Sequence, residues 1–353
     1  MNELETERRM IRMPRHFVTG VCGFVASHLA KRLLKEGHEV WGVDNLDCGF
    51  MANIEDILEH PKFHFKNMDI RHVEGGNIKG GVDYVWHLAA RGEVYWVRDN
   101  PELALEVNVV GTLNILKQAK KMGADHFYFA DTSAEYDSFE ESQHYPSAEW
   151  MAPNTITPMG YYPITKMCAS QFVRSFGKKN DIGTTLFRYT NIYGPSMNLE
   201  RDIPPVVGAF TNALLNGGTP IFYGNGAKRR DFLHIDDLTD FHIAALKARG
   251  SEKDTQTYNA GSGENYSILE VYRHVYNACK NIKNDIASDA EYRPDQPDEA
   301  QVTLANIEKA YKELEWSPTI SFEEGVEKTV KSLANMMGVK NDSESNTKNE
   351  EKS

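Results

Sequence analysis

Short apolar runs alternate with amphipathic segments along most of the chain. The first run, residues 16–18, leads to Gly20, and the segment after Gly23 keeps helical periodicity until Gly37. Further runs predict strands at residues 39–43, 62–66, 82–86 and 126–130, and the segment 101–122 predicts a long helix. Strands that alternate with helices are typical of a parallel sheet covered on both faces. The pattern therefore predicts an α/β fold, a doubly wound parallel sheet with a smaller C-terminal α/β lobe.

The turn between the first strand and the first helix has the residues of a phosphate-binding loop. Gly20 gives the backbone its freedom, and Gly23 lets the main chain approach a pyrophosphate at the positive end of the helix. The second strand ends at Asp44, whose carboxylate would accept hydrogen bonds from an adenosine ribose and repel a 2′-phosphate. We therefore predict a dinucleotide site that prefers NAD to NADP, although Asn45 or Arg32 could alter that balance.

Tyr162 and Lys166 lie four residues apart in a segment that is predicted to be helical. At this spacing both side chains leave the same face of the helix. A phenol has a reference pKa of about 10, and a nearby cation lowers this value because it favours the phenolate. Such a pair can take a proton from a sugar hydroxyl. The spacing also occurs by chance on solvated helix faces, so the neighbouring motifs decide its meaning.

Composition limits the classes of protein that fit. A chain of 353 residues can bury a large core, and a net charge of −12 argues against a broad nucleic-acid surface. No apolar run is long enough to cross a membrane or to form the core of a signal peptide. The histidines form no zinc pattern, and the spacing of the four cysteines is not that of metal ligands, so we predict no metal and a cytoplasmic location. The cysteines are Cys22, Cys48, Cys168 and Cys279.

Several motifs together resemble the extended short-chain dehydrogenase/reductase family, in its group of nucleotide-sugar epimerases and dehydratases. The resemblance covers residues from about 15 to 335, and its pieces keep the family's order and approximate spacing. The matching segments are Thr19-Gly20-x-x-Gly23-Phe24, Asp44-Asn45-Leu46, Met68-Asp69-Ile70, His87-Leu88-Ala89-Ala90, Asn108-Val109-Val110-Gly111-Thr112, Tyr162-x-x-x-Lys166, Arg188-Tyr189-x-Asn191-Ile192-Tyr193-Gly194-Pro195 and Arg230-Asp231-Phe232-x-His234-x-Asp236-Asp237.

The resemblance implies a Rossmann-type sheet, NAD as cofactor and a homodimer. It places Asp69 and Ile70 beside the adenine and the backbone of Ala89 and Ala90 along the cofactor. An alternative for Asp69 is that it only caps the following turn. The full set of residues that we predict to bind the cofactor is Gly20, Cys22, Gly23, Phe24, Val25, Asp44, Asn45, Asp69, Ile70, Leu88, Ala89, Ala90, Asn108, Tyr162 and Lys166.

The segment after the fifth strand departs most from the family. Relatives usually carry a hydroxyl residue, two variable residues, then Val, Tyr and Gly. A match without gaps makes Thr132 the catalytic hydroxyl and puts Ala134 where dehydratases and decarboxylases carry Glu. A deletion of one residue instead makes Ser133 the hydroxyl and Glu135 the acid. We prefer the match without gaps, because shortening a strand end beside an active site disturbs several contacts.

The C-terminal part is expected to bind the substrate. Asn191 resembles the family's nucleotide-sugar contact, and Arg230 could pair with a diphosphate. The alternatives are that Asn191 only shapes a turn and that Arg230 pairs with Asp236 or Asp237. Arg293 belongs to a second diphosphate-like segment in which Gln296 stands where many relatives have Arg. The nucleotide base and the sugar are not determined.

The sequence thus predicts four parts: a mobile leader at residues 1–14, a mainly NAD-binding domain at 15–190, a mainly nucleotide-sugar-binding lobe at 191–337 with strands that return to the first domain, and a disordered tail at 338–353. The predicted activity is that of a nucleotide-sugar 4-epimerase that forms a transient 4-keto sugar. The nearby alternative is a 4,6-dehydratase or decarboxylase. An alternative of another class is a non-catalytic sensor or scaffold that binds a dinucleotide, which the changes around Val21, Asp131 and Asp137 keep open.

Overall fold

A parallel sheet lies at the centre of the structure, which is a computed structural model that describes residues 13–75, 78, 80–137, 145–151, 158–200, 204–286, 289–297 and 299–339. Within these residues the sheet has seven strands in the order β10-β6-β5-β4-β1-β2-β3, and every neighbouring pair is parallel. The strands are β1 (Arg15–Thr19), β2 (Glu39–Asp44), β3 (Phe63–Asn67), β4 (Tyr84–His87), β5 (His126–Thr132), β6 (Gly183–Tyr189) and β10 (Thr255–Ala260). The order reverses between β1 and β4, as in Rossmann-type sheets, so the predicted fold class is confirmed.

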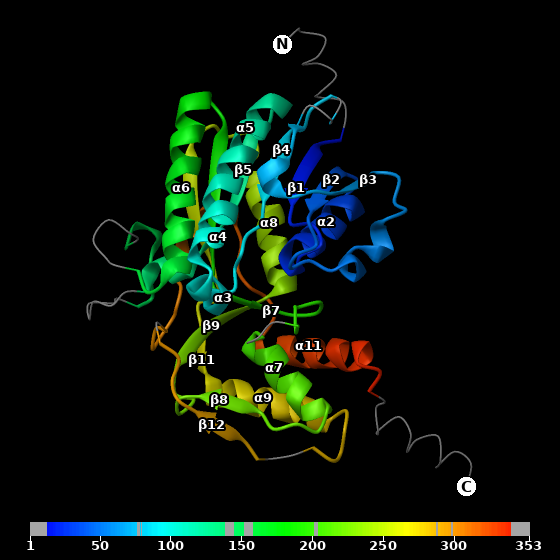
Figure 1. Ribbon diagram of the computed structural model, residues 1–353, viewed down its shortest axis with the longest axis vertical. Helices are drawn as coiled ribbons and strands as arrows, with labels where there is room; N and C mark the ends of the chain where they lie inside the picture. Colours follow the sequence, from blue (N-terminus) through cyan, green and yellow to red (C-terminus); the bar gives the residue numbers. More distant parts are fainter. Residues whose placement is uncertain are drawn as a thin grey trace.

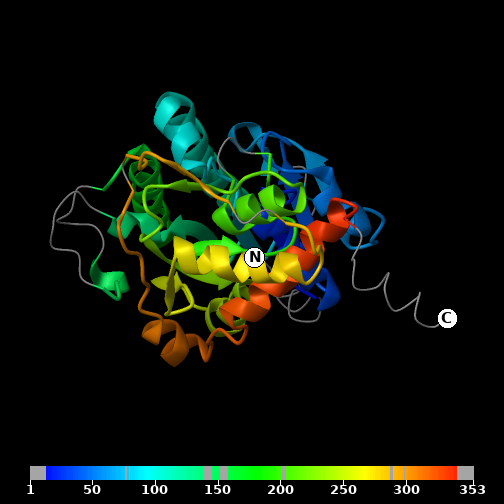
Figure 2. The same cartoon turned by 90° about the horizontal axis from the view of Figure 1, so that it is seen from below.

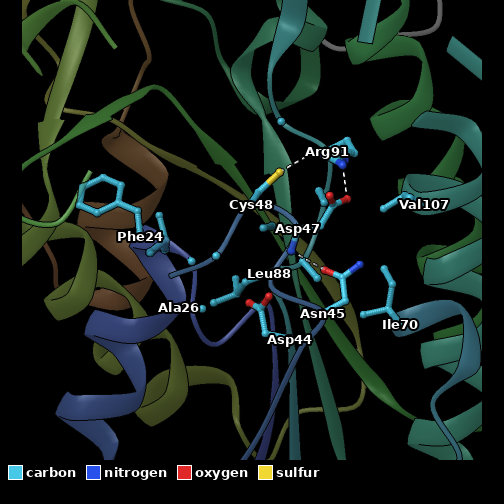
Figure 3. Close-up of a pocket in the computed structure, with 18 of the residues that line it drawn as sticks. Phe24, Ala26, Asp44, Asn45, Asp47, Cys48, Ile70, Leu88, Arg91 and Val107 are labelled. Carbon is cyan, nitrogen blue, oxygen red and sulfur yellow. Dashed lines mark hydrogen bonds and ion pairs between the residues drawn. The ribbon is translucent and has the colours of Figure 1, made fainter. Parts of the chain in front are cut away.

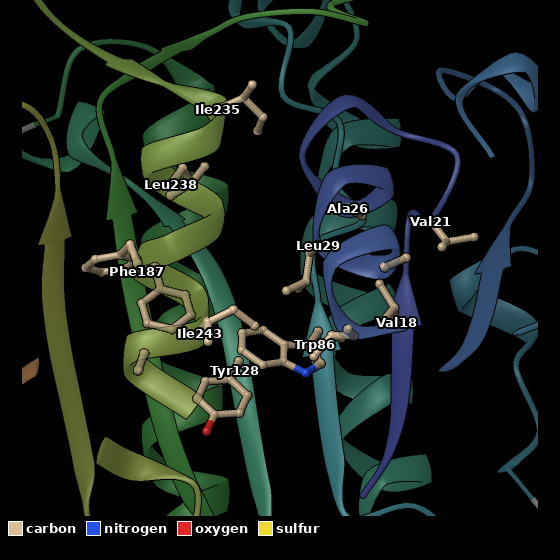
Figure 4. Packing of buried hydrophobic residues seen from close by; sticks show 14 of the residues in the cluster. Val18, Val21, Ala26, Leu29, Trp86, Tyr128, Phe187, Ile235, Leu238 and Ile243 are labelled. Carbon is tan, nitrogen blue, oxygen red and sulfur yellow. The ribbon is translucent and has the colours of Figure 1, made fainter. Parts of the chain in front are cut away.

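Helices cover both faces of this sheet (Figure 1). On one face α2 (Phe24–Lys35) packs against α8 (Ile235–Arg249). Their apolar sides meet Trp86, Tyr128 and Phe187 of the sheet, whose rings stack with centroids 3.9 Å apart for the first pair and 5.8 Å for the second (Figure 4). Burying each such side chain contributes about 1.5–3 kcal/mol. The α2–α8 layer therefore fixes the strand ends from which the site is built.

The opposite face is covered by α5 (Thr112–Met122) and α6 (Tyr161–Asn180), with α3 (Val94–Asp99) and α4 (Pro101–Leu105) beside them. The segment predicted as one helix at 101–122 is interrupted by a π-helical stretch, η5 (Glu106–Gly111). Gly111 lies so close to η3 (Ile70–His72) that an added Cβ would stand 2.6 Å from the Ile70 Cδ1 atom. The irregular segment η5 therefore packs tightly on η3. The apolar periodicity of the sequence does not predict this interruption of the helix.

A second lobe follows the sheet. It contains a three-stranded sheet, β11-β9-β7, and a two-stranded sheet, β12-β8, among the described residues. Viewed from below, the yellow α9 and the red α11 run side by side across this lobe (Figure 2). Its elements are β7 (Asn191–Tyr193), α7 (Val206–Leu215), β8 (Ile221–Tyr223), β9 (Arg229–His234), β11 (Asn265–Ser267), α9 (Ile268–Lys280), β12 (Glu291–Arg293) and α11 (Phe322–Met336).

The chain returns to the first domain through α8 and β10, which follow one another along the chain. The short helix α10 (Glu308–Leu314) packs on both of these elements. The remaining short helical turns are η1 (Met51–Asn53), η2 (Glu55–Ile57), η6 (Ser133–Tyr136) and η7 (Glu149–Met151). The predicted leader and tail lie outside the described residues, except for residues 13–14 and 338–339.

Two negative findings hold for the described part of the chain. None of its helices is both long and apolar enough to cross a membrane. In the same residues no group of three or more His, Cys, Asp or Glu side chains is arranged to hold a metal ion.

Candidate active site

A pocket opens at the carboxyl ends of β1, β2, β4 and β5, where the strand order reverses (Figure 3). This is where ligands bind in open α/β sheets. Most of the predicted cofactor residues line it. They are Gly20, Gly23, Phe24, Val25, Asp44, Asn45, Asp69, Ile70, Leu88, Ala89, Ala90, Tyr162 and Lys166.

The turn after β1 is shaped to admit a phosphate. Gly20 has φ +71°, and a Cβ there would lie 2.9 Å from the Ala89 Cα atom. A Cβ on Gly23 would lie 2.9 Å from the Gly20 carbonyl oxygen. Helix α2 starts at Phe24 without a side-chain cap, so its first N–H groups face the pocket with the positive end of the helix dipole. The cradle fits the pyrophosphate of a dinucleotide.

The Asp44 carboxyl is fixed at the end of β2. Its Oδ1 atom accepts a hydrogen bond from the Leu46 N–H at 2.8 Å, and its Oδ2 atom accepts one from the Cys22 N–H at 3.0 Å. Burial raises the pKa of Asp44, while these two N–H groups lower it. Arg32, which could have favoured NADP, pairs instead with Glu36 and Asp240. Within the described residues, the arrangement therefore fits ribose hydroxyls better than a 2′-phosphate.

Asp69 is held by a neighbouring arginine. The Arg71 side chain donates to Asp69 from Nε at 3.0 Å and from Nη2 at 2.9 Å, and Asn45 donates to it from Nδ2 at 3.1 Å. The Arg71 hydrogen bonds lower the pKa of Asp69 to about 2. Asp69 also accepts from the Arg71 N–H and caps η3, and its side chain lines the pocket as well, so it does more than cap the turn.

Arg91 is a pocket residue that the motifs did not indicate. Its guanidinium donates to the Cys48 Sγ atom at 2.6 Å and to the Asp47 carboxylate, and it lies 4.2 Å from the centre of the Trp96 ring (Figure 3). These contacts connect the loops after β2 and β4. The only sequence signal is that Arg91 directly follows the Leu88-Ala89-Ala90 segment.

Tyr162 and Lys166 enter the pocket from the first turns of α6, which begins after Gly160 with φ +82°. Lys166 is only 3% exposed, and its Nζ atom lies 4.2 Å from the centre of the Phe129 ring. Burial lowers the pKa of Lys166 to about 8 against the opposing effect of nearby carboxyls. A Cβ on Gly92 would stand 3.9 Å from the Tyr162 Oη atom, and both residues line the pocket.

The loop after β5 holds the residues of both registers, and neither Thr132 nor Ser133 lines the pocket. Thr132 ends the strand, is 7% exposed, and accepts a hydrogen bond from the Ala134 N–H at 3.2 Å. Ser133 is half-buried in η6. Glu135 is fully buried and pairs with Arg188 at 3.0 Å, and it does not line the pocket. The strand is two residues longer than predicted, and it brings Asp131 to the pocket wall.

Two predicted cofactor residues act from behind the pocket wall. The Asn108 Oδ1 atom accepts from the Arg91 N–H at 2.8 Å, and its Nδ2 atom donates to the Arg91 carbonyl and to Thr165 Oγ1, both at 3.0 Å. The Cys22 side chain is buried, which raises its pKa to about 12, and only its N–H reaches Asp44. Neither residue lines the pocket, so each supports other residues there.

The predicted substrate residues do not gather in this pocket. Asn191 is exposed and donates from Nδ2 to the Asp231 carbonyl at 3.0 Å, and Arg293 is exposed and pairs with Glu291 on β12. Arg230 is 14% exposed, with Nη2 at 3.7 Å from Glu299 rather than beside Asp236 or Asp237. Their roles in substrate binding stay predictions.

Comparisons with known proteins agree with this geometry. The NAD dependent epimerase/dehydratase family matches residues 16–261. UDP-glucuronic acid decarboxylase 1 of Danio rerio is 32% identical over 320 residues, which are 90% of this chain and 72% of the relative. The putative UDP-glucose 4-epimerase of Methanocaldococcus jannaschii is 29% identical over 323 residues, which are 90% of this chain and 98% of the relative.

One solved structure shows the likeness of the fold. The crystal structure of UDP-glucuronic acid 4-epimerase from Bacillus cereus, in complex with UDP-glucuronic acid and NAD, superposes with a TM-score of 0.81 at 25% identity. The match covers 91% of this chain and 99% of that chain. The family match spans more than half of the sequence and includes the phosphate turn, the Tyr162–Lys166 pair and the central sheet. This chain belongs to the NAD-dependent epimerase/dehydratase family.

Proposed function

We propose that the protein is an NAD-dependent 4-epimerase of nucleotide sugars that acts through a transient 4-keto sugar. The observation that carries this proposal is the presence of the Tyr162–Lys166 pair in the same pocket as the dinucleotide cradle. UDP-sugar 4-epimerases among the relatives and solved structures support a UDP-sugar as the substrate.

The residues of the pocket supply the proton transfers. When bound, NAD supplies the acceptor and donor of a hydride. Tyr162, as the phenolate, takes the proton of the C4 hydroxyl and later returns it to the oxygen of the other epimer. Lys166 stabilises the phenolate by its charge. Thr132 holds the reacting oxygen in line, a positioning role that removes part of the entropic barrier.

The second candidate is a decarboxylase, which UDP-glucuronic acid decarboxylases among the relatives, at 30% to 32% identity, favour. That reaction needs an additional acid or base near the keto sugar. In the preferred register Ala134 stands at the position of the family's glutamate, and Glu135 is engaged with Arg188. The proposal therefore ranks epimerisation first. The sensor or scaffold alternative ranks lower because both members of the Tyr162–Lys166 pair are present.

The test is a scan of UDP-sugars, analysed by mass spectrometry and NMR. Epimerisation leaves the mass unchanged and moves the sugar H4 signals, whereas decarboxylation removes carbon dioxide and dehydration removes water. An unchanged mass with an inverted C4 centre supports the proposal. A product that has lost mass contradicts it, and the absence of turnover with every sugar favours the sensor alternative.

Thr132→Val should reduce turnover by roughly 100-fold, because it removes the hydroxyl that positions the substrate and keeps the side-chain volume. Glu135→Gln should change turnover far less. Single-turnover absorbance of reduced nicotinamide reports the oxidation step directly. If Glu135→Gln instead lets reduced cofactor accumulate while Thr132→Val is nearly normal, the shifted register with Ser133 and Glu135 is correct and a dehydratase becomes the better proposal.

Asp44→Ala should narrow the preference for NAD over NADP. The loss of the carboxylate removes hydrogen bonds to the ribose and the repulsion of a 2′-phosphate, which together are worth about 1–3 kcal/mol of discrimination. Titration of both cofactors into the apoprotein by fluorescence measures this change. Asp47→Ala, which removes a nearby carboxylate that faces Arg91, is a control. If the wild type binds NAD and NADP with equal affinity, the assignment of Asp44 to the ribose hydroxyls loses its basis.

We also propose a homodimer formed through the exposed faces of α4, η5 and α6, which contact one another. Large apolar side chains stay exposed there, at 52% for Leu105, 48% for Val110 and 41% for Phe172. Contiguous exposed apolar surface is typical of an interface. The double variant Val110→Glu/Phe172→Glu should be a monomer by light scattering, while Tyr292→Glu, which changes an exposed aromatic of β12, should keep the wild-type mass. A monomeric wild type contradicts the proposal.

A cytosolic location is our proposal for the compartment. None of the four cysteines forms a disulfide, and Cys22 and Cys279 are buried. Reducing compartments maintain thiols in this form.

A further inference from the structure

Asp131 is a buried acid that the proposed mechanism leaves without a role. It lies on the pocket wall between Ala130 and Thr132 and is 2% exposed. Neither of its carboxyl oxygens accepts a well-formed hydrogen bond from the described residues. Burying a carboxyl without well-formed hydrogen bonds costs free energy, so the charged groups around Asp131 matter for its role.

Charged groups surround Asp131 from three elements. Helix α6 contributes Lys166 and, farther away, Arg174, and β6 contributes Arg188. The third is η6, with Glu135, whose carboxyl interacts electrostatically with that of Asp131. Burial and Asp131 raise the pKa of Glu135, and burial raises that of Asp131 against the charges of Arg188 and Lys166.

Among the charged groups, Asp131 is the one that most favours the charged form of Lys166. Arg188 is committed to Glu135 by contacts of 3.0 and 3.1 Å, and it also donates to the Tyr136 hydroxyl and the Glu149 carbonyl. On β4, His87 is neutral, because burial and then the charge of Lys166 lower its pKa to about 3.

Strand geometry places Asp131 beside the ammonium. Phe129 and Asp131 are two residues apart on β5, so their side chains leave the same face of the strand. The Phe129 ring lies 4.2 Å from the Lys166 Nζ atom, and Asp131 is the next side chain on that face toward the pocket. Burial lowers the pKa of Lys166, and Asp131 is the group that opposes this effect most.

We propose that Asp131 is a positioning residue for the reaction, whose carboxylate is the counter-charge that keeps the buried Lys166 in its ammonium form beside Tyr162. The kinetic test of this inference rests on the proposed function. The inference adds to the proposed mechanism a residue outside the Tyr162–Lys166 pair. Loss of this counter-charge allows Lys166 to lose its proton at a lower pH, and the phenolate of Tyr162 then loses its cation.

Asp131→Asn is the direct test, because it removes the charge and keeps the shape. A carboxylate near a cation raises the pKa of the cation by about one to three units, so its removal should move the alkaline limb of the kcat profile down by one unit or more. Each unit is a tenfold loss at a fixed pH above the limb. Asp131→Glu, which restores the charge, should return the limb toward its wild-type position. Asp125→Asn, at the exposed opposite end of the same strand and paired with Lys253, should leave the profile unchanged.

A spectroscopic titration gives a readout that does not depend on turnover. Tyrosine has a reference pKa of roughly 10, and its phenolate absorbs at 295 nm. Subtracting the absorbance of the matching Tyr162→Phe variant leaves the signal of Tyr162 in the apoprotein. Asp131→Asn should raise the midpoint, because Lys166 then loses its proton at a lower pH and the phenolate of Tyr162 forms without its cation. If Asp131→Asn does not fold, Asp131→Ser provides the same measurement with a smaller neutral side chain.

The outcomes separate the two proposals. A wild type without turnover on any nucleotide sugar contradicts the proposed function, and the 295 nm midpoints still decide the role of Asp131. If the wild type is active, the Asp131 proposal is contradicted when the alkaline limb and the 295 nm midpoint of Asp131→Asn stay at their wild-type positions. It is also contradicted when kcat of the variant falls equally at every pH, since that pattern indicates a structural defect alone.

Discussion

Tyr162→Phe should bind NAD as tightly as the wild type and turn over its sugar at least about 100-fold more slowly, because general acid–base catalysis contributes about 10²- to 10⁴-fold. The change removes only the phenolic oxygen. The ring stays in the first turn of α6, and the cradle formed by Gly20, Gly23 and the start of α2 is untouched. Steady-state kinetics, together with titration of NAD, measures both quantities.

The neighbouring residue offers a matched control. Tyr161 carries the same phenol on the same helix but is 53% exposed and does not line the pocket, so Tyr161→Phe should keep wild-type turnover. Lys166→Ala should impair turnover and weaken NAD binding, because its side chain lines the cofactor pocket. Near-normal turnover in Tyr162→Phe would show that the proposed chemistry is wrong.

The first half of the fold could be predicted because its signals are local. A glycine turn, a helical period and an acid at the end of the next strand lie within the first 44 residues, and each reports on the conformation of its own neighbourhood. The strand boundaries differ from the prediction by one or two residues, as at β5, where the polar pair Asp131 and Thr132 continues the strand because it is buried and bonded to β6. Polarity alone suggested a loop there.

The parts that could not be predicted depend on contacts between distant segments. Arg91 reaches Asp47 and Cys48 across 43 to 44 positions, and Arg230 faces Glu299 rather than the acids that follow it in the sequence. No local pattern specifies such partners, because the topology brings the loops together only after the sheet has formed. The same reason explains why the sequence left the register open.

Glu135 shows this most clearly. Glu135 stands where the match without gaps has the family's Val, and the shifted register would make it the catalytic acid. Its partner, Arg188, lies 53 positions later on β6, and the pair is buried together at 0% and 2% exposure. The arginine thus gives the glutamate a structural partner, and the catalytic role of Glu135 in the shifted register stays a prediction.

Arg188→Met should destabilise the protein by about 3–5 kcal/mol, because it leaves a buried carboxyl without its cation. The guanidinium also donates to the Tyr136 hydroxyl and to the Glu149 carbonyl, so both acceptors lose a partner as well. Chemical denaturation monitored by circular dichroism measures the loss as a lower midpoint. Arg293→Met is the matched control, because that arginine is 44% exposed and pairs with Glu291 on the surface, where an ion pair is worth about 0–1 kcal/mol.

The double variant Glu135→Gln/Arg188→Met tests the cause of that loss. If the cost comes from the unpaired carboxyl, neutralising Glu135 should recover about 1–3 kcal/mol of it, and the two changes should be strongly non-additive. Additive losses would mean that Arg188 stabilises the fold through its packing and its other hydrogen bonds. Recovery would show that Arg188 stabilises the fold mainly by pairing with Glu135. Asp131 would then be the acid of this loop that faces the pocket.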